Sequence, residues 1–180
     1  VAMLLTILNF GALPLAFWET RTPWMKLAYG GLLAIASIGL YAQLARPVSR
    51  PRKTVLMAVT VVSLMALVGA VWWLTRAEPD RGAALMGRSW TYCPSRVVLL
   101  AAPTLAGLLL LMRRWAPTNL RAAGFAAGLA AGGVGMCVYA VSCGESSPTF
   151  VAVWYTVGAL VSALLGATLA LPGPTGEKNT

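Results

Sequence analysis

Two cysteines offer the reactive chemistry in this sequence, and the first of them is Cys93. Pro94 follows it directly, and because proline favours the first position of a helix, Cys93 is predicted to be a helix N-cap. The helix dipole and the nearby Arg88 and Arg96 would stabilise a thiolate at this place. Cys93 is therefore expected to be the better nucleophile of the pair.

The second cysteine, Cys143, has the opposite setting. It ends an apolar stretch, and the Gly144 after it is typical of a helix C-cap. The negative helix end and Glu145 disfavour its thiolate, so Cys143 suits a resolving partner for Cys93. A static disulfide, two inert thiols and a metal site completed by outside ligands are the alternatives. Cys137 lies among apolar neighbours and is assigned no role.

The composition restricts the elements that can position these thiols. Of the 180 residues, 58% are hydrophobic and 11% are charged, and histidine is absent. Soluble domains carry roughly a quarter charged residues, so an ordinary cytosolic enzyme is excluded, and the high hydrophobicity excludes intrinsic disorder. Five acidic residues and no histidine speak against a hard-metal or carboxylate-rich catalytic centre. We expect neither an enzyme nor a bound cofactor.

Six apolar stretches are long enough to cross a bilayer as helices, and none shows the alternation of a barrel strand. They cover residues 2–18, 25–45, 55–74, 97–112, 122–141 and 150–171, with residues 172–180 as a short tail. The fourth stretch is the shortest, so its helix is expected to extend into its flanks. In the long loop before it, Pro79, Gly82 and Gly87 are expected to interrupt regular structure. The predicted fold is an all-α, polytopic membrane bundle of six transmembrane helices, arranged as three hairpins. A start at Val1 rather than at methionine leaves open that residues precede it.

Basic residues orient this bundle. Two connections between stretches carry Lys and Arg without acids, and their basic residues include Arg46, Arg50, Arg52, Lys53, Arg113 and Arg114. Because cytoplasmic loops are rich in Lys and Arg, these loops and both termini are predicted to face the cytoplasm, with Cys93 and Cys143 outside. The same residues are candidate contacts for a cytoplasmic partner, and attraction to anionic lipid is the simpler alternative. The net charge of +9 therefore requires no nucleic-acid partner.

Small residues at a spacing of four mark the last two stretches. They are Gly124, Gly128 and Gly132 in the fifth stretch, and Gly158, Ser162 and Gly166 in the sixth. In lipid, small residues allow two helices to approach closely. The two stretches are predicted to form a tight antiparallel hairpin, and a homodimer seam is the alternative.

No ionisable residue lies deep within any of the six stretches. Lys26 lies near the end of the second stretch, and its long side chain is expected to reach the membrane interface by snorkelling. Ion and proton pathways normally need charges at depth, so a pump or coupled transporter is not expected.

Three segments resemble the NrsF family of bacterial membrane anti-sigma factors, the negative regulators of sigma F. Residues 86–93, MGRSWTYC, resemble the family's Gly-x-Ser-Trp-x-x-Cys segment. Residues 112–118 resemble its inner loop, and residues 143–158 its last hairpin. The positions around the thiols that carry this resemblance are Gly87, Ser89, Trp90, Pro94, Ser147 and Pro148. The similarity extends more loosely over residues 1–171.

The resemblance implies a six-span protein of the bacterial inner membrane that holds an extracytoplasmic-function sigma factor inactive. The family's paired cysteines correspond to Cys93 and Cys143, and they imply release of the sigma factor when periplasmic thiols sense redox or heavy-metal stress. Family members usually carry a short polar segment before the first span. This sequence shows none, so either the given chain is truncated or docking uses the inner loops. A membrane thiol oxidoreductase and a scaffold subunit without chemistry are the alternatives. The first of these has no Cys-x-x-Cys motif to support it.

Overall fold

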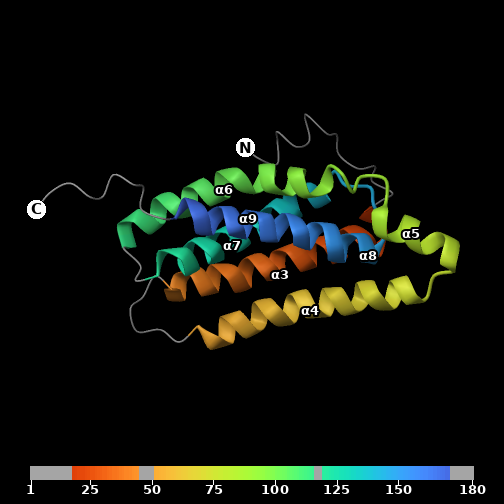
Figure 1. Ribbon diagram of the computed structural model, residues 1–180, viewed down its shortest axis with the longest axis horizontal. Coiled ribbons are helices and arrows are strands. Elements are labelled where there is room, and N and C mark those ends of the chain that lie inside the picture. Colours follow the sequence, from red (N-terminus) through yellow and green to blue (C-terminus); the bar gives the residue numbers. More distant parts are fainter. Residues whose placement is uncertain (1–17, 45–50, 116–118, 171–180) are drawn as a thin grey trace, which may run out of the picture.

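The computed structural model describes residues 18–44, 51–115 and 119–170. Over these ranges every regular element is a helix (Figure 1). The helices are α3 (Arg21–Leu44), α4 (Arg52–Leu74), α5 (Glu78–Met86), α6 (Cys93–Trp115), α7 (Leu120–Ala140), α8 (Pro148–Phe150), the π-helical turn η1 (Val151–Tyr155) and α9 (Thr156–Leu169). The all-helical fold class is therefore confirmed for the described part of the chain.

Five of the described helical segments are long and apolar enough to cross a membrane by length and composition. They match the second to sixth predicted stretches, whereas the first stretch and the 172–180 tail lie outside the described residues. α6 runs from Cys93 to Trp115, so the short fourth stretch extends into both flanks as expected. The last crossing segment is Pro148–Leu169, in which η1 interrupts the regular helix with one wide turn.

The bundle has two ends that matter for function. We call the end that holds α5, the start of α6 and the start of α8 the thiol end, and the end where α4 begins and α6 ends the basic end (Figure 1). α7 runs from the basic end to the thiol end, and α6 and α9 run back. Each long helix therefore connects the two ends directly.

α7 is the central helix, because its small residues let three neighbours reach its backbone. A Cβ atom added at Gly128 would lie 2.6 Å from the Cα of Ala163 on α9. One added at Gly133 would lie 2.7 Å from the Ala34 nitrogen on α3, and one at Gly135 would meet the Val97 carbonyl on α6. Only glycine permits these approaches, and close backbone packing replaces the hydrophobic effect between helices in lipid.

The predicted small-residue faces are only partly arranged as expected. Gly124, Gly128 and Gly132 all face α9, and Gly166 faces Gly124 in return. Gly158 does not belong to this face, because a Cβ there would lie 2.8 Å from the Val97 side chain on α6. The Gly124–Gly128–Gly132 face is covered within the chain, so it is not free to form a homodimer seam.

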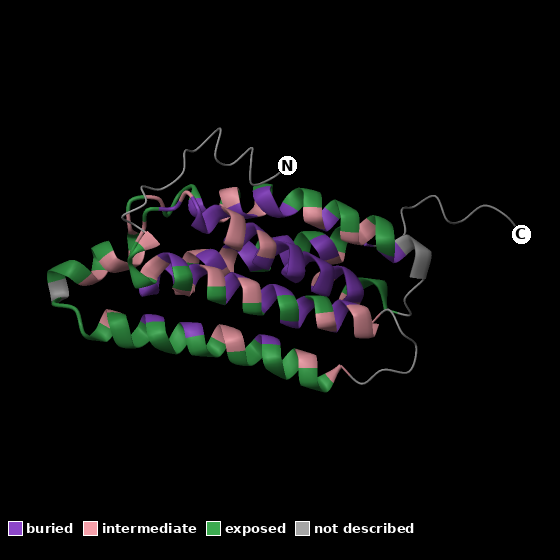
Figure 2. Ribbon diagram, turned by 180° about the vertical axis from the view of Figure 1, so that it is seen from behind, coloured by how far each residue is buried: buried purple, intermediate pink, exposed green. Residues whose placement is uncertain are grey.

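α4 is the peripheral helix. Its buried residues are Ala58, Met65 and Gly69, and Figure 2 shows most of its length as exposed. Near the thiol end, the Thr149 hydroxyl donates a 2.8 Å hydrogen bond to the Gly69 carbonyl and attaches α4 to α8. The remaining apolar side chains of α4 suit contact with lipid.

The segment between α4 and α6 differs from the sequence-based expectation. Pro79, Gly82 and Gly87 were expected to interrupt regular structure, yet α5 forms over Glu78–Met86. Pro79 lies in the first turn of α5, where its missing N–H costs nothing. Gly82 is tolerated on the exposed helix, and Gly87 ends it with φ of 56°, a conformation that glycine adopts readily.

Candidate functional site

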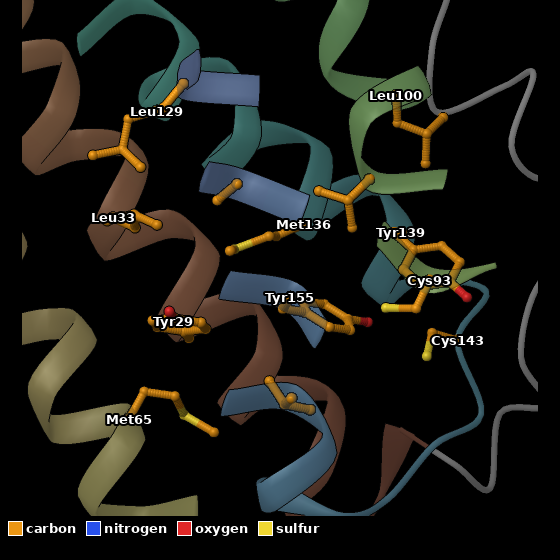
Figure 3. Packing of buried hydrophobic residues seen from close by; sticks show 14 of the residues in the cluster. Tyr29, Leu33, Met65, Cys93, Leu100, Leu129, Met136, Tyr139, Cys143 and Tyr155 are labelled. Carbon is orange, nitrogen blue, oxygen red and sulfur yellow. The ribbon is translucent and has the colours of Figure 1, made fainter. Parts of the chain in front are cut away.

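The two thiols lie in one buried cluster at the thiol end. Cys93 is 0% exposed and Cys143 is 3% exposed, and neither is in a disulfide. Figure 3 shows both sulfurs at the edge of the core, beside Tyr139 and Tyr155. Cys137 lies elsewhere on α7, where its thiol contacts the Leu27 carbonyl at 3.7 Å. The structure therefore brings together the two cysteines that the sequence singled out, as free thiols.

The burial of Cys93 does not fit its predicted setting as an accessible N-cap thiol. It is the first residue of α6, and its N–H donates a 2.9 Å bond to the Ser89 carbonyl, which continues the turn before the helix. Arg96 and Lys26 act electrostatically on the Cys93 thiol, whereas the Arg88 side chain is exposed. Because thiol reactivity depends on access, complete burial makes Cys93 the less reachable thiol.

Lys26 is the residue that sequence reasoning missed. Its side chain is fully buried, and its ammonium donates a 2.6 Å hydrogen bond to the Cys143 carbonyl, so the expected snorkelling to the interface is wrong. The bond satisfies a carbonyl that follows the end of α7, where a positive charge is favourable. Its one signal in the sequence is that Lys26 is the single charged residue inside the six predicted stretches.

Glu145 holds the two loops of the thiol end together. Its carboxylate accepts a 2.7 Å hydrogen bond from the Arg88 N–H and a 3.1 Å bond from the Ser89 hydroxyl. A Cβ at Gly87 would lie 2.9 Å from the same carboxylate and 2.7 Å from the Phe150 ring. The Glu145 carboxylate thus packs against the Gly-x-Ser part of the motif and is hydrogen-bonded to it.

The other motif residues fix α5 against the last crossing segment. Trp90 packs on Trp154 with ring centroids 5.5 Å apart, and the Trp154 indole donates a 2.9 Å bond to the Leu85 carbonyl. Ser147 caps α8 and also donates a 2.7 Å bond to the Ala84 carbonyl. Pro148 begins α8 and is buried, and Pro94 lies in the first turn of α6, half-buried.

A polar pocket of about 270 Å³ opens above the thiol cluster. Its lining is Arg88, Ser89, Arg96, Tyr139, Ser142, Cys143, Gly144 and Glu145. Cys143 belongs to this lining and Cys93 does not, so the pocket leads to Cys143 first. A small polar reagent entering here would meet two guanidinium groups and one thiol.

Two tyrosines form the inner wall of the cluster. The Tyr139 and Tyr155 rings pack with centroids 5.7 Å apart. The Tyr155 hydroxyl is buried and has no hydrogen-bond partner among the described residues, although it acts electrostatically on Cys143. Figure 3 shows this hydroxyl directed toward the two sulfurs.

Within the described ranges no three His, Cys, Asp or Glu side chains come together in a way that could hold a metal ion. Two thiols alone do not complete the tetrahedral set that zinc normally takes.

The predicted partner contacts at the basic end are placed only in part. Arg52 and Lys53 begin α4 and are exposed, and Arg113 and Arg114 lie in the last turn of α6. Arg46 and Arg50 lie outside the described residues.

Comparison with known proteins gives a consistent assignment. The sequence profile of the family described as NrsF, negative regulator of sigma F, matches residues 1–172. The chain belongs to the NrsF family. The anti-sigma-F factor NrsF of Caulobacter vibrioides is 38% identical over 146 residues, which cover 79% of this chain and 67% of that protein. A probable anti-sigma-F factor NrsF of Azospira oryzae is 34% identical over 148 residues, 81% of this chain and 68% of the relative.

No solved structure matches the chain. Membership of the NrsF family confirms the resemblance drawn from the motifs, and it points to a regulatory protein rather than an enzyme. The motif residues that carried the resemblance are those that surround the two thiols and the Glu145 carboxylate.

Proposed function

We propose that the chain is an anti-sigma factor of the bacterial inner membrane. It holds a sigma factor of the extracytoplasmic-function type at the cytoplasmic face and releases it when Cys93 and Cys143 react. The names of the Caulobacter and Azospira relatives support the sigma factor as partner. The observation that carries the sensing step is the pair of free, buried thiols beneath a polar pocket.

The helices supply a physical connection between the sensing thiols and the partner. α6 begins with Cys93 and has Arg113 and Arg114 in its last turn, so one helix joins the thiol end to the basic end. α7 makes the second connection, because it ends three residues before Cys143. A covalent change at the thiols that shifts α6 against α7 would change the arrangement of the basic residues. Release needs two states of the bundle with different affinities for the sigma factor.

The partner contacts that we assign to the basic end are Arg46, Arg50, Arg52, Lys53, Arg113 and Arg114. Their charge suits an acidic surface on the sigma factor, and it also suits the anionic lipid of the inner leaflet. Replacing Arg52 and Lys53 by glutamine separates these two roles. Loss of sigma-factor binding with unchanged membrane insertion supports the contact, and unchanged binding removes these two residues from it.

The function is tested by co-purification from cells. Membranes carrying the tagged full chain are isolated before and after treatment with a thiol-reactive reagent, and the bound sigma factor is quantified. We expect release from the wild type and from the matched control Cys137→Ser, and retention by the double variant Cys93→Ser/Cys143→Ser. Release from the double variant would contradict thiol sensing. The absence of any sigma factor from untreated membranes would contradict the anti-sigma role itself.

A further inference from the structure

Two polar groups near Cys143 are buried at a cost that packing alone does not explain. The Lys26 ammonium is removed from water entirely and donates to the Cys143 carbonyl at 2.6 Å. The Tyr155 hydroxyl is equally buried and has no hydrogen-bond partner in the described part of the chain. Buried polar groups are normally satisfied, and an exception calls for a functional reason.

Both groups act on the same residue. The Lys26 ammonium acts electrostatically on the Cys143 and Cys93 thiols and on the Glu145 carboxylate. The Tyr155 hydroxyl points toward the two sulfurs and interacts with Cys143 (Figure 3). A thiolate at Cys143 would therefore have a cation nearby and a hydroxyl that can donate a hydrogen bond to it.

Access selects the same thiol. Cys143 lines the polar pocket together with Arg88 and Arg96, whereas Cys93 is absent from the lining and has no contact with solvent. The carboxylate of Glu145 accepts hydrogen bonds from the Arg88 N–H and the Ser89 hydroxyl, and these donors stabilise its negative charge.

We propose that Cys143 is the thiol that reacts first, and that Lys26 and Tyr155 are its positioning residues. The Lys26 ammonium stabilises the Cys143 thiolate by its charge, and the Tyr155 hydroxyl donates a hydrogen bond to the thiolate. Cys93 is then the resolving thiol, the reverse of the order expected from the sequence. This inference rests on the proposed sensing function, and it concerns the chemistry of the site alone.

With a peroxide as oxidant the steps balance as follows. The proton of Cys143 passes to water in the pocket, and the thiolate attacks one peroxide oxygen, so that a sulfur–oxygen bond forms and the oxygen–oxygen bond breaks. Hydroxide or alkoxide leaves, and Cys143 becomes a sulfenic acid. The Cys93 sulfur then attacks the Cys143 sulfur, water leaves, and the disulfide forms. Two electrons pass from the two thiols to the peroxide.

The charged and titratable groups that face Cys143 come from every element packed around it. They are Lys26 on α3, Arg96 and Cys93 on α6, Tyr139 on α7, Tyr155 on η1, and Arg88 and Glu145 on the two loops. Apart from Cys93 itself, Lys26 and Tyr155 are the two whose replacement leaves the pocket lining unchanged, so they give the cleanest variants.

The test measures alkylation of the purified, reduced full chain in detergent by N-ethylmaleimide, with mass spectrometry resolving the three cysteines. We expect Cys143 to be modified before Cys93. Lys26→Met and Tyr155→Phe should each slow modification of Cys143 by about tenfold, since each removes a stabilising contact to a charged group. Lys26→Arg should restore most of the rate, and the matched control Arg21→Met, at the exposed start of the same helix, should leave it unchanged.

Thermal unfolding of the same samples separates chemistry from folding. Slower alkylation at an unchanged thermal midpoint supports the positioning roles. Faster modification of Cys93 than of Cys143, or a wild-type rate in Tyr155→Phe, would overturn the proposal. If Lys26→Met does not fold, Tyr155→Phe decides alone, because it removes one oxygen and keeps the ring contact with Tyr139. The measurement needs no sigma factor, so its failure is distinct from failure of the anti-sigma role.

Discussion

The Lys26 ammonium and the Cys143 carbonyl are joined by a buried 2.6 Å hydrogen bond across 117 positions of sequence. The bond connects the first turns of α3 to the residues that follow α7. Because the carbonyl and the sulfur belong to the same residue, the proposed reaction at Cys143 predicts that a backbone shift there also moves the attachment of α3.

Gly128→Leu should destabilise the bundle strongly. The Gly128 Cα lies against the backbone of Ser162 and Ala163, and a leucine there would force α7 and α9 apart. Overpacking of this kind costs about 1–3 kcal/mol or more of unfolding free energy. The thermal midpoint in detergent measures it. Gly107→Leu on α6 is the matched control, because a side chain at Gly107 meets open space. Equal midpoints for the two variants would show that α7 and α9 are not packed as described.

Gly87→Ala and Gly82→Ala should have opposite effects. Gly87 has φ of 56° and lies against Phe150, so a methyl group is strained there and should cost about 1 kcal/mol or more. Gly82 lies within α5 with open space around it, so alanine should stabilise the helix by about 0.5–1 kcal/mol. The midpoint of chemical unfolding should lie below that of the wild type for Gly87→Ala and above it for Gly82→Ala. A loss of stability in both would mean that α5 is not a helix.

The orientation of the bundle is tested with single cysteines in a chain lacking all three native thiols. Ser146→Cys lies in the exposed part of the loop before α8 and should react with an impermeant maleimide applied to spheroplasts. Ser49→Cys lies between α3 and α4 and should react only after the membrane is permeabilised. Labelling of position 49 alone in intact spheroplasts would reverse the assigned orientation.

Thr149→Val should loosen α4 without disturbing the rest of the bundle. The variant keeps the shape of the side chain but loses the bond to the Gly69 carbonyl, worth about 1 kcal/mol. Hydrogen exchange of α4 amides should become faster near Gly69 while exchange in α7 stays as it is. Thr168→Val is the control, since the Thr168 hydroxyl bonds only within α9. Similar exchange in both variants would mean that Thr149 does not attach α4.

The crossing helices could be predicted from the sequence because hydrophobic length alone determines them. The small residues of α7 likewise predicted close packing, although the sequence could not divide them among three neighbours. The sequence does not reveal α5, because proline and glycine are typical of interruptions in regular structure. In the folded chain Pro79 lies in the first turn of α5 and Gly87 ends it. The direction of the Lys26 side chain was missed because it depends on a carbonyl that only the folded chain brings near. The same folding buried Cys93 behind Cys143, a relation that spacing cannot reveal.

The glycines of α7 have a consequence for how this protein tolerates substitution. In most proteins the largest core side chains are the least replaceable, because their loss leaves cavities. Here the least replaceable positions are Gly124, Gly128 and Gly133, where even one methyl group collides with a neighbouring backbone. The bulky side chains exposed on α4, such as Leu56 and Leu67, should by contrast tolerate replacement by other apolar residues. A saturation screen should therefore find these glycines of α7 less tolerant of substitution than the exposed leucines of α4.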